Sequence, residues 1–265
     1  CGFRSIESCQ SSRPGTPRSS QTRIRRSRAV GSAGSNLSHV VPALLLWDLD
    51  ETLVTTAGAG ERAIIRSARK HWSVDVDLSL IPYAGCTDRR IGHLIRKHFG
   101  IAEDASTLRA YLDDFVNFVS EELPDSGARI LPGILEVVEA ARTSSDHQQG
   151  LLTGNLRAAA EAKLAPFGLW DYFSFGAFAD DAIERLDLGP VALARASQCY
   201  GVTFAPEEVT VIGDTPHDVA CARAIGARSL AVASGRFTPE QLAECEPTCL
   251  VRSLQEPAAL SFLSL

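Results

Sequence analysis

Short apolar runs alternate with segments of helical periodicity through most of this chain, and this alternation restricts the possible folds more than any other feature. The strand-like runs lie at residues 41–47, 150–152, 172–178, 209–212 and 229–233. Alanine-rich segments with helical spacing separate the later runs, at residues 156–167, 190–200 and 218–225. Alternating strands and helices form parallel sheets with helices on both faces. We therefore predict an α/β fold whose core is a doubly wound parallel (Rossmann-like) sheet.

A long stretch between about residues 61 and 123 departs from this alternation. Its apolar residues recur at helical spacing, as Ala63, Ile64 and Ala68 do, and no convincing strand interrupts them. We expect a small helical domain at residues 57–129, inserted into a core made of residues 39–56 and 130–265.

The first 38 residues have a different composition from the rest of the chain. They contain seven arginines among many serines, and Glu7 is their only acid. Such a segment cannot bury enough apolar surface to fold, so we expect it to be disordered. It is interpreted either as an over-extended or fragmentary translation or as an organellar transit peptide, whose composition it shares. We accordingly expect a cytoplasmic protein, or one of an organellar matrix or stroma if the segment is a targeting sequence.

Charge and cysteine usage restrict the possible partners. The net charge of -6 argues against nucleic-acid binding, because proteins that bind the phosphate backbone concentrate Lys and Arg on one surface. The seven cysteines form no CxxC pair, and the apolar runs are too short to cross a bilayer. We expect a reduced, soluble monomer or homodimer without a membrane partner.

The end of the first strand carries two carboxylates. Asp48 and Asp50 follow the apolar run that ends at Trp47. Ligands of open α/β sheets bind at the carboxyl ends of the strands, and paired buried carboxylates need a compensating cation. The pair favours a divalent metal site, although a solvated turn has the same local sequence.

Two later strands also end at polar residues. The strand at residues 150–152 leads into Thr153, Gly154 and Asn155, which are suited to contacting a phosphate group but are also common in turns and helix caps. The strand at residues 209–212 leads into Asp214 and Asp218, whose oxygens suit magnesium. Asp218 lies near a helix start, so capping is an alternative role for it.

Taken in order, these motifs resemble those of the haloacid dehalogenase superfamily. The superfamily pattern is DxDxT/V, a strand-end Ser or Thr, a Lys or Arg, and an acidic GDxxxD, and the match extends from about Leu44 to Ala233. The runs around Pro132, Thr153 and Asp214 look closest to phosphoglycolate-phosphatase-like members. In that family the helical insert is a cap domain that closes over the site.

The resemblance implies a role for each matching residue. Asp48 would be the nucleophile and Asp50 the general acid and base. Thr153 would hold a phosphate oxygen. Asp48, the carbonyl of Asp50 and Asp214 would bind Mg²⁺, and Asp218 would support the metal through water or orient a ligand.

The cation that the family pattern requires is not obvious here, since no Lys-Pro pair stands at its usual place. Counting back from the helix near residue 190 puts Arg185 at the corresponding position. Arginine grips phosphate bidentately and offsets clustered carboxylates. A solvated arginine at a helix end is the alternative interpretation.

Substrate specificity is expected to lie in the insert, in the loop that contains Thr87, Asp88 and Arg89. Arg89 or its neighbour Arg90 would meet a substrate carboxylate. The alternative is a Thr-Asp helix cap followed by solvated arginines.

These interpretations predict a magnesium-dependent phosphatase that hydrolyses a small phosphorylated metabolite, similar to phosphoglycolate, through an aspartyl-phosphate intermediate. A phosphomutase on sugar phosphates and a catalytically weak binding protein of the same fold are the alternatives. Asp50 argues against a dehalogenase, because a halide leaving group needs no proton. The helical insert argues against the protein-serine phosphatases that share the Asp48 to Val54 motif.

Overall fold

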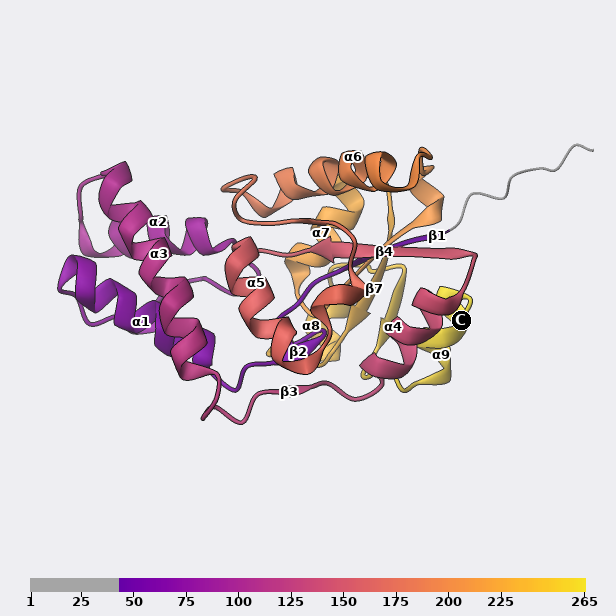
Figure 1. Ribbon diagram of the computed structural model, residues 1–265, viewed down its shortest axis with the longest axis horizontal. Coiled ribbons are helices and arrows are strands. Elements are labelled where there is room, and N and C mark those ends of the chain that lie inside the picture. Colours follow the sequence, from indigo (N-terminus) through magenta and orange to yellow (C-terminus); the bar gives the residue numbers. More distant parts are fainter. Residues whose placement is uncertain (1–42) are drawn as a thin grey trace, which may run out of the picture. The chain divides into compact units, whose positions relative to one another are not determined.

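A six-stranded parallel sheet forms the centre of the protein in this computed structural model, which describes residues 43–265 (Figure 1). The strands follow the order β5-β4-β1-β6-β7-β8, and every neighbouring pair is parallel. Their bounds are Ala43–Trp47 for β1, His147–Leu152 for β4, Gly176–Ala177 for β5, Val209–Gly213 for β6, Arg228–Val232 for β7 and Cys249–Val251 for β8. The predicted α/β fold class is confirmed.

Helices cover both faces of the sheet because successive residues of a strand point to opposite faces. Leu45 and Trp47 of β1 pack with α4 (Ile134–Thr143), α5 (Arg157–Leu164) and α9 (Pro257–Leu263). Leu44 and Leu46 pack with α6 (Leu188–Tyr200) and α7 (Pro216–Ala224) on the other face. All four β1 side chains are fully or almost fully buried. Helices cover both faces of β1, which explains why this strand is apolar at every position.

Three helices between β1 and β4 form a separate apolar cluster. They are α1 (Ala59–Trp72), α2 (Asp88–Phe99) and α3 (Ala105–Glu122), and their cluster includes Tyr111 and Phe115. We call these helices and their connections the helical module. Two short strands, β2 (Val54–Thr55) and β3 (Arg129–Ile130), pair antiparallel where the chain leaves the sheet and returns to it. The module also packs on Ala159 of α5 and on Leu156, which directly precedes this helix (Figure 1).

Some elements differ from the sequence prediction. The strand predicted at residues 172–178 is only two residues long, because Trp170–Tyr172 forms a 3-10 turn and β5 is an edge strand. The closing elements β8, α8 (Pro239–Ala243) and α9 were not predicted, since they are short and weakly periodic. The prediction for residues 1–38 lies outside the described residues.

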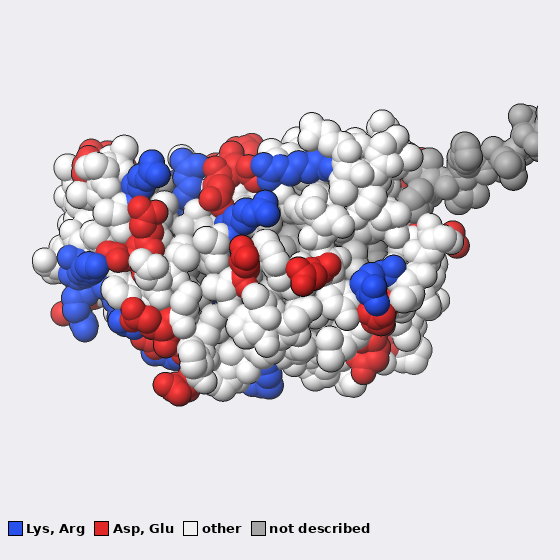
Figure 2. Space-filling model, viewed as in Figure 1, with Lys and Arg blue, Asp and Glu red and all other residues white. Residues whose placement is uncertain are grey.

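Charged side chains of both signs are interspersed over the face seen in Figure 2. Ion pairs of the helical module include Arg66 with Glu121 and Glu122, and Lys70 with Asp114. Among residues 43–265, no helix combines the length and the apolar character that a membrane crossing requires.

Candidate active site

Three neighbouring strands bring the predicted polar residues together. β1 lies between β4 and β6, so the residues that follow these strands meet at one edge of the sheet. Asp48 and Asp50 follow β1, Thr153 follows β4, and Asp214 follows β6. These residues come from distant parts of the sequence but form a single cluster in space.

Asp48, Asp214 and Asp218 form the acidic centre of this cluster. Each offers a carboxylate oxygen within 4.8 Å of the others, and all three side chains are buried. Burial and the carboxylates of Asp48 and Asp218 raise the pKa of Asp214 to about 9. Burial also raises the pKa of Asp48, against the attraction of Arg185. Three buried carboxylates need more positive charge than one arginine supplies, and their oxygen donors suit Mg²⁺.

Two glycines allow the backbone to approach these carboxylates. A Cβ atom at Gly235 would lie 1.8 Å from Oδ2 of Asp214, and one at Gly213 would lie 2.1 Å from Cγ of Asp218. Any larger residue would displace the carboxylate it meets. Glycine at these positions is thus part of how the site is built.

Arg185 lies inside the acidic centre, in a short 3-10 helix before α6. Its Nη2 is 2.8 Å from Oδ1 of Asp48 and also contacts Oδ1 of Asp218. The side chain is buried, and its Nε has no hydrogen-bond partner among the described residues. The solvated alternative for this arginine therefore does not apply.

Asp218 also has the capping role that the sequence left open. Thr215 is the N-cap of α7, and the Asp218 carboxylate accepts hydrogen bonds from the Thr215 backbone N–H at 3.0 Å and from its hydroxyl at 2.7 Å. Asp218 therefore both caps the helix and contacts Arg185.

Asp50 has partners that sequence reasoning missed. The Nζ atom of Lys163, in α5, lies 2.9 and 2.7 Å from the two carboxylate oxygens of Asp50 and 2.6 Å from Oδ1 of Asn155. The amide of Asn155 donates to Asp50 at 2.8 Å. Helical spacing could have identified Lys163 as a buried residue, because it follows the buried Ala159 by one turn of α5.

The residues after β4 divide into two groups. Gly154 and Asn155 line the cavity described below. Thr153 is fully buried, and its hydroxyl oxygen accepts a hydrogen bond from the Asn155 side chain at 2.9 Å. It lies one residue from the cavity lining.

The loop expected to determine specificity meets the cavity, although its two arginines do not line it. Thr87 caps α2 and donates its hydroxyl hydrogen to the Ile183 carbonyl. Asp88 lines the cavity, and its carboxylate accepts from the Leu156 backbone N–H at 2.7 Å. Arg89 lies outside the lining and reaches the Asp180 carbonyl at 3.5 Å, because the N-terminal turn of α2 directs it away. Arg90 is also outside and pairs with Glu184 at 3.2 Å. Neither arginine is placed to meet a substrate in this cavity.

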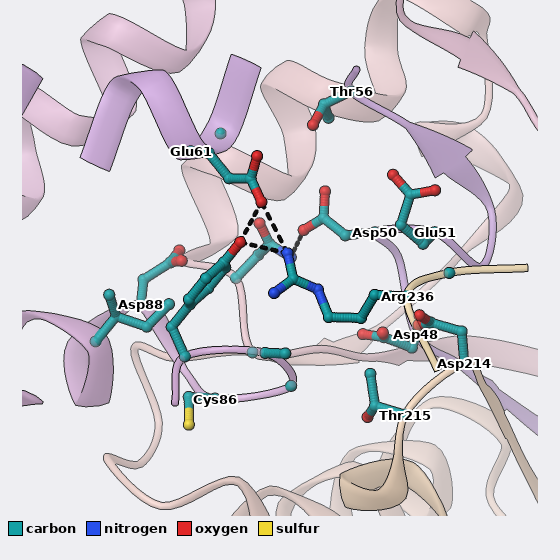
Figure 3. Close-up of a pocket in the computed structure, with 18 of the residues that line it drawn as sticks. Asp48, Asp50, Glu51, Thr56, Glu61, Cys86, Asp88, Asp214, Thr215 and Arg236 are labelled. Carbon is teal, nitrogen blue, oxygen red and sulfur yellow. Dashed lines mark hydrogen bonds and ion pairs between the residues drawn. The ribbon is translucent and has the colours of Figure 1, made fainter. Parts of the chain in front are cut away.

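A cavity of about 390 Å³ joins the acidic centre to the helical module. The arginine on its module side is Arg236, from the loop after β7. It donates to Glu61 of α1 at 2.9 Å and contacts the hydroxyl of Tyr83 (Figure 3). Its guanidinium carbon lies 4.5 Å from the centre of the Tyr83 ring. These contacts link the core to the module at the edge of the cavity.

The turn after Asp50 has an unusual backbone conformation. Glu51 follows Asp50 directly, and its φ is 57°. This left-handed conformation is one that glycine adopts without strain. The Ser234 hydroxyl donates to the Glu51 carbonyl and so ties this turn to the loop after β7.

Comparisons with known proteins agree with this geometry. The family model of haloacid dehalogenase-like hydrolases matches residues 45–223. The protein named "Probable phosphatase IndB" from Dickeya dadantii is 29% identical over 216 residues, covering 80% of this chain and 90% of that protein. Phosphoglycolate phosphatase of Thiobacillus denitrificans is 28% identical over 133 residues, covering 50% of this chain and 57% of that protein. The structure of CbbY from Rhodobacter sphaeroides has a TM-score of 0.65 and 21% identity, covering 85% of this chain and all of that one (100%).

Proposed function

The chain belongs to the haloacid dehalogenase-like hydrolase family, and on that premise we propose that it is a magnesium-dependent phosphatase acting on a small phosphorylated metabolite. The observation that carries the proposal is the meeting of Asp48, Asp50, Lys163 and Arg185 at one cavity, beside a buried cluster of carboxylates. The relatives named as phosphatases support the same activity.

Asp48 is proposed as the nucleophile. Its side chain is only 6% exposed and is held by Arg185, so its carboxylate keeps one orientation. An Asp48 oxygen forms a bond to phosphorus while the bond between phosphorus and the leaving oxygen breaks. The product of this step is an aspartyl phosphate and an alcohol.

Asp50 is proposed as the general acid and base. Its side chain is 39% exposed, unlike that of Asp48, so both substrate and water reach it. Asp50 gives a proton to the departing alcohol oxygen, and then takes one from the water that attacks the phosphoryl group. Attack by water releases inorganic phosphate and restores Asp48. Lys163 and Asn155 hold the Asp50 carboxylate in place for both steps.

The phosphoryl group would be bound by donors around Asp48. Arg185 lines the cavity and contacts Asp48, so its guanidinium would donate to a phosphate oxygen. Gly154 and Asn155 line the same side of the cavity, and Thr153 lies next to them. Asp48, Asp214 and the Asp50 carbonyl would hold Mg²⁺, with Asp218 in a supporting position. When bound, the ion neutralises negative charge on the transferring group.

We also propose that residues 57–129 form a cap domain. Side chains of α1, α2 and α3 line the cavity opposite the acidic centre, and a closed module would exclude water from the reaction. The paired strands β2 and β3 are the natural place for a hinge, since both chain crossings lie there.

Release of inorganic phosphate from a panel of phosphate esters, with and without Mg²⁺, tests the activity. Asp48→Asn should abolish turnover and leave thermal unfolding unchanged, because an amide cannot form the aspartyl phosphate. Asp171→Asn is the matched control, since Asp171 is exposed and does not line the cavity. Wild-type turnover in Asp48→Asn would exclude the mechanism. Isomer formation without release of phosphate would instead identify a phosphomutase.

A further inference from the structure

We propose that the substrate of this phosphatase carries a neutral and largely apolar body, such as an aromatic ring, and not a second anionic group. This inference rests on the function proposed above and adds the chemical class of the leaving alcohol. It is carried by the side of the cavity that faces away from the aspartates.

The helical module contributes an apolar surface to the cavity. Ile64 of α1, Ile91 of α2 and Phe115 of α3 all line it, so each of the three helices supplies one apolar side chain. Tyr83, from the loop between α1 and α2, adds an aromatic ring. We call these four residues the apolar wall. An aromatic or aliphatic group that packs against such a wall leaves water, which favours binding.

The cations that line the cavity already have carboxylate partners. Arg185 pairs with Asp48, Lys163 pairs with Asp50, and Arg236 pairs with Glu61. The first two also belong to the phosphate end of the site. Among the described lining residues, no unpaired cation is left for a substrate carboxylate. A substrate with a second negative charge would have to break one of these pairs.

Acidic side chains line the part of the cavity in which the body of the substrate would bind. Asp88 lines the cavity between α2 and the residues after β4, across from Asp48 and Asp214 (Figure 3). Glu61 lies beside Arg236 in the same view. A carboxylate on the substrate would be repelled by the Glu61 carboxylate. Burial raises the pKa of Asp88 to about 7, so Asp88 is partly protonated near neutral pH and repels an anion less than Glu61 does.

The size of the cavity agrees with a larger body. Its volume of about 390 Å³ lies within the range of about 300 to 1,000 Å³ that is usual for small-molecule sites. A two-carbon acid such as phosphoglycolate would fill only a small part of this volume. A phosphate ester of an arylalkyl alcohol would fill more of it and would reach the apolar wall.

Three phosphate esters with primary alkyl leaving groups separate the two effects. Ethyl phosphate has neither a ring nor a second charge, 2-phenylethyl phosphate adds the ring, and phosphoglycolate adds the carboxylate. We expect kcat/KM for 2-phenylethyl phosphate to exceed that for ethyl phosphate by about 10- to 100-fold, from the burial of one aromatic group. Phosphoglycolate should be no better than ethyl phosphate.

Two variants and one matched control test the residues that line the cavity. Ile64→Ala should reduce the preference for 2-phenylethyl over ethyl phosphate by about 3- to 10-fold, whereas Ile65→Ala, which deletes the same atoms outside the lining, should not. Glu61→Gln removes a negative charge near the cavity edge, where Glu61 is 44% exposed, so folding should be retained. It should raise kcat/KM for phosphoglycolate relative to ethyl phosphate.

Equal rates for ethyl and 2-phenylethyl phosphate, or phosphoglycolate as the fastest of the three, would overturn the inference and leave the phosphatase function standing. If no ester is hydrolysed, calorimetry on the Asp48→Asn chain distinguishes failure of the proposed function from failure of this inference. Binding of 2-phenylethyl phosphate at least 10-fold tighter than ethyl phosphate would then support the apolar wall while the proposed function fails. Equal binding of the two esters would overturn the inference as well.

Discussion

Lys163 provides the sharpest test of how the site positions its general acid and base. Lys163→Met keeps the length of the side chain and removes the ammonium that contacts both oxygens of Asp50. Lys70→Met is the matched control, because Lys70 also lies 2.6 Å from a carboxylate, that of Asp114, but is 54% exposed.

The expected loss of stability follows from the two environments. Removing one partner of a fully buried ion pair costs about 3 to 5 kcal/mol, and an exposed pair is worth about 0 to 1 kcal/mol. Lys163 is 4% exposed, but Asp50 is 39% exposed, so water will stabilise the released carboxylate in part. We expect the free energy of unfolding to fall by about 1 to 3 kcal/mol in Lys163→Met and by less than about 1 kcal/mol in Lys70→Met.

The effect on catalysis should depend on the leaving group. General acid catalysis contributes about 10²- to 10⁴-fold, so a misplaced Asp50 should lower kcat for ethyl phosphate by about 10- to 100-fold. The p-nitrophenolate ion leaves without needing a proton, so p-nitrophenyl phosphate should lose less in the step that releases the alcohol. Phosphate release measured at saturating Mg²⁺ and substrate, beside urea unfolding, gives both quantities. Equal losses on the two substrates, or wild-type kcat on ethyl phosphate, would refute a positioning role for Lys163.

Three further predictions follow from the acidic centre and the cavity. A chelator should abolish phosphate release, and added Mg²⁺ should restore it. Asp214→Asn should raise the Mg²⁺ concentration for half-maximal activity by roughly 10- to 100-fold or more. Full activity in the presence of the chelator would contradict the metal site. Gly235→Ala should impair activity similarly, because its Cβ would lie 1.8 Å from Oδ2 of Asp214, and a wild-type Mg²⁺ titration would show that this approach is unimportant. Burial raises the pKa of Asp88 from 3.8 to about 7. Between these two pH values the unfolded chain has lost the Asp88 proton and the folded chain still holds it, so the free energy of unfolding falls as the pH rises. Asp88→Asn lacks this penalty, and its advantage in urea unfolding should grow from pH 4 to pH 7 by up to about 4 kcal/mol; a constant difference across that range would mean that Asp88 titrates normally.

Much of the acidic centre was predictable because its signals are local. Asp48, Asp50 and Asp214 each follow a short apolar strand, and Asp218 lies in the first turn of the helix after Asp214. The carboxyl ends of parallel strands share one edge of a sheet. Arg185 was found by its distance from the next helix. These positions depend on backbone periodicity and chain connection, which a sequence displays directly.

Residues that reach the site from elsewhere were not predictable in the same way. Lys163 faces Asp50 only because α5 packs against the sheet beside β4. Arg236 lies at the cavity because the loop after β7 meets α1 and the Tyr83 loop. Arg89 was expected there and is directed to Asp180 instead, since the capped start of α2 determines where its side chain points.

The sequence by itself therefore determined the alternation of strands and helices, the helical insert and the carboxylates at the strand ends. Tertiary structure alone decided which cation holds Asp50, which arginine borders the cavity, and that Ile64, Ile91 and Phe115 form one apolar wall. The physical reason is that strand and helix periodicity arises from neighbouring residues. The contacts of a side chain across a cavity depend on how distant elements pack, and residue spacing does not encode that packing.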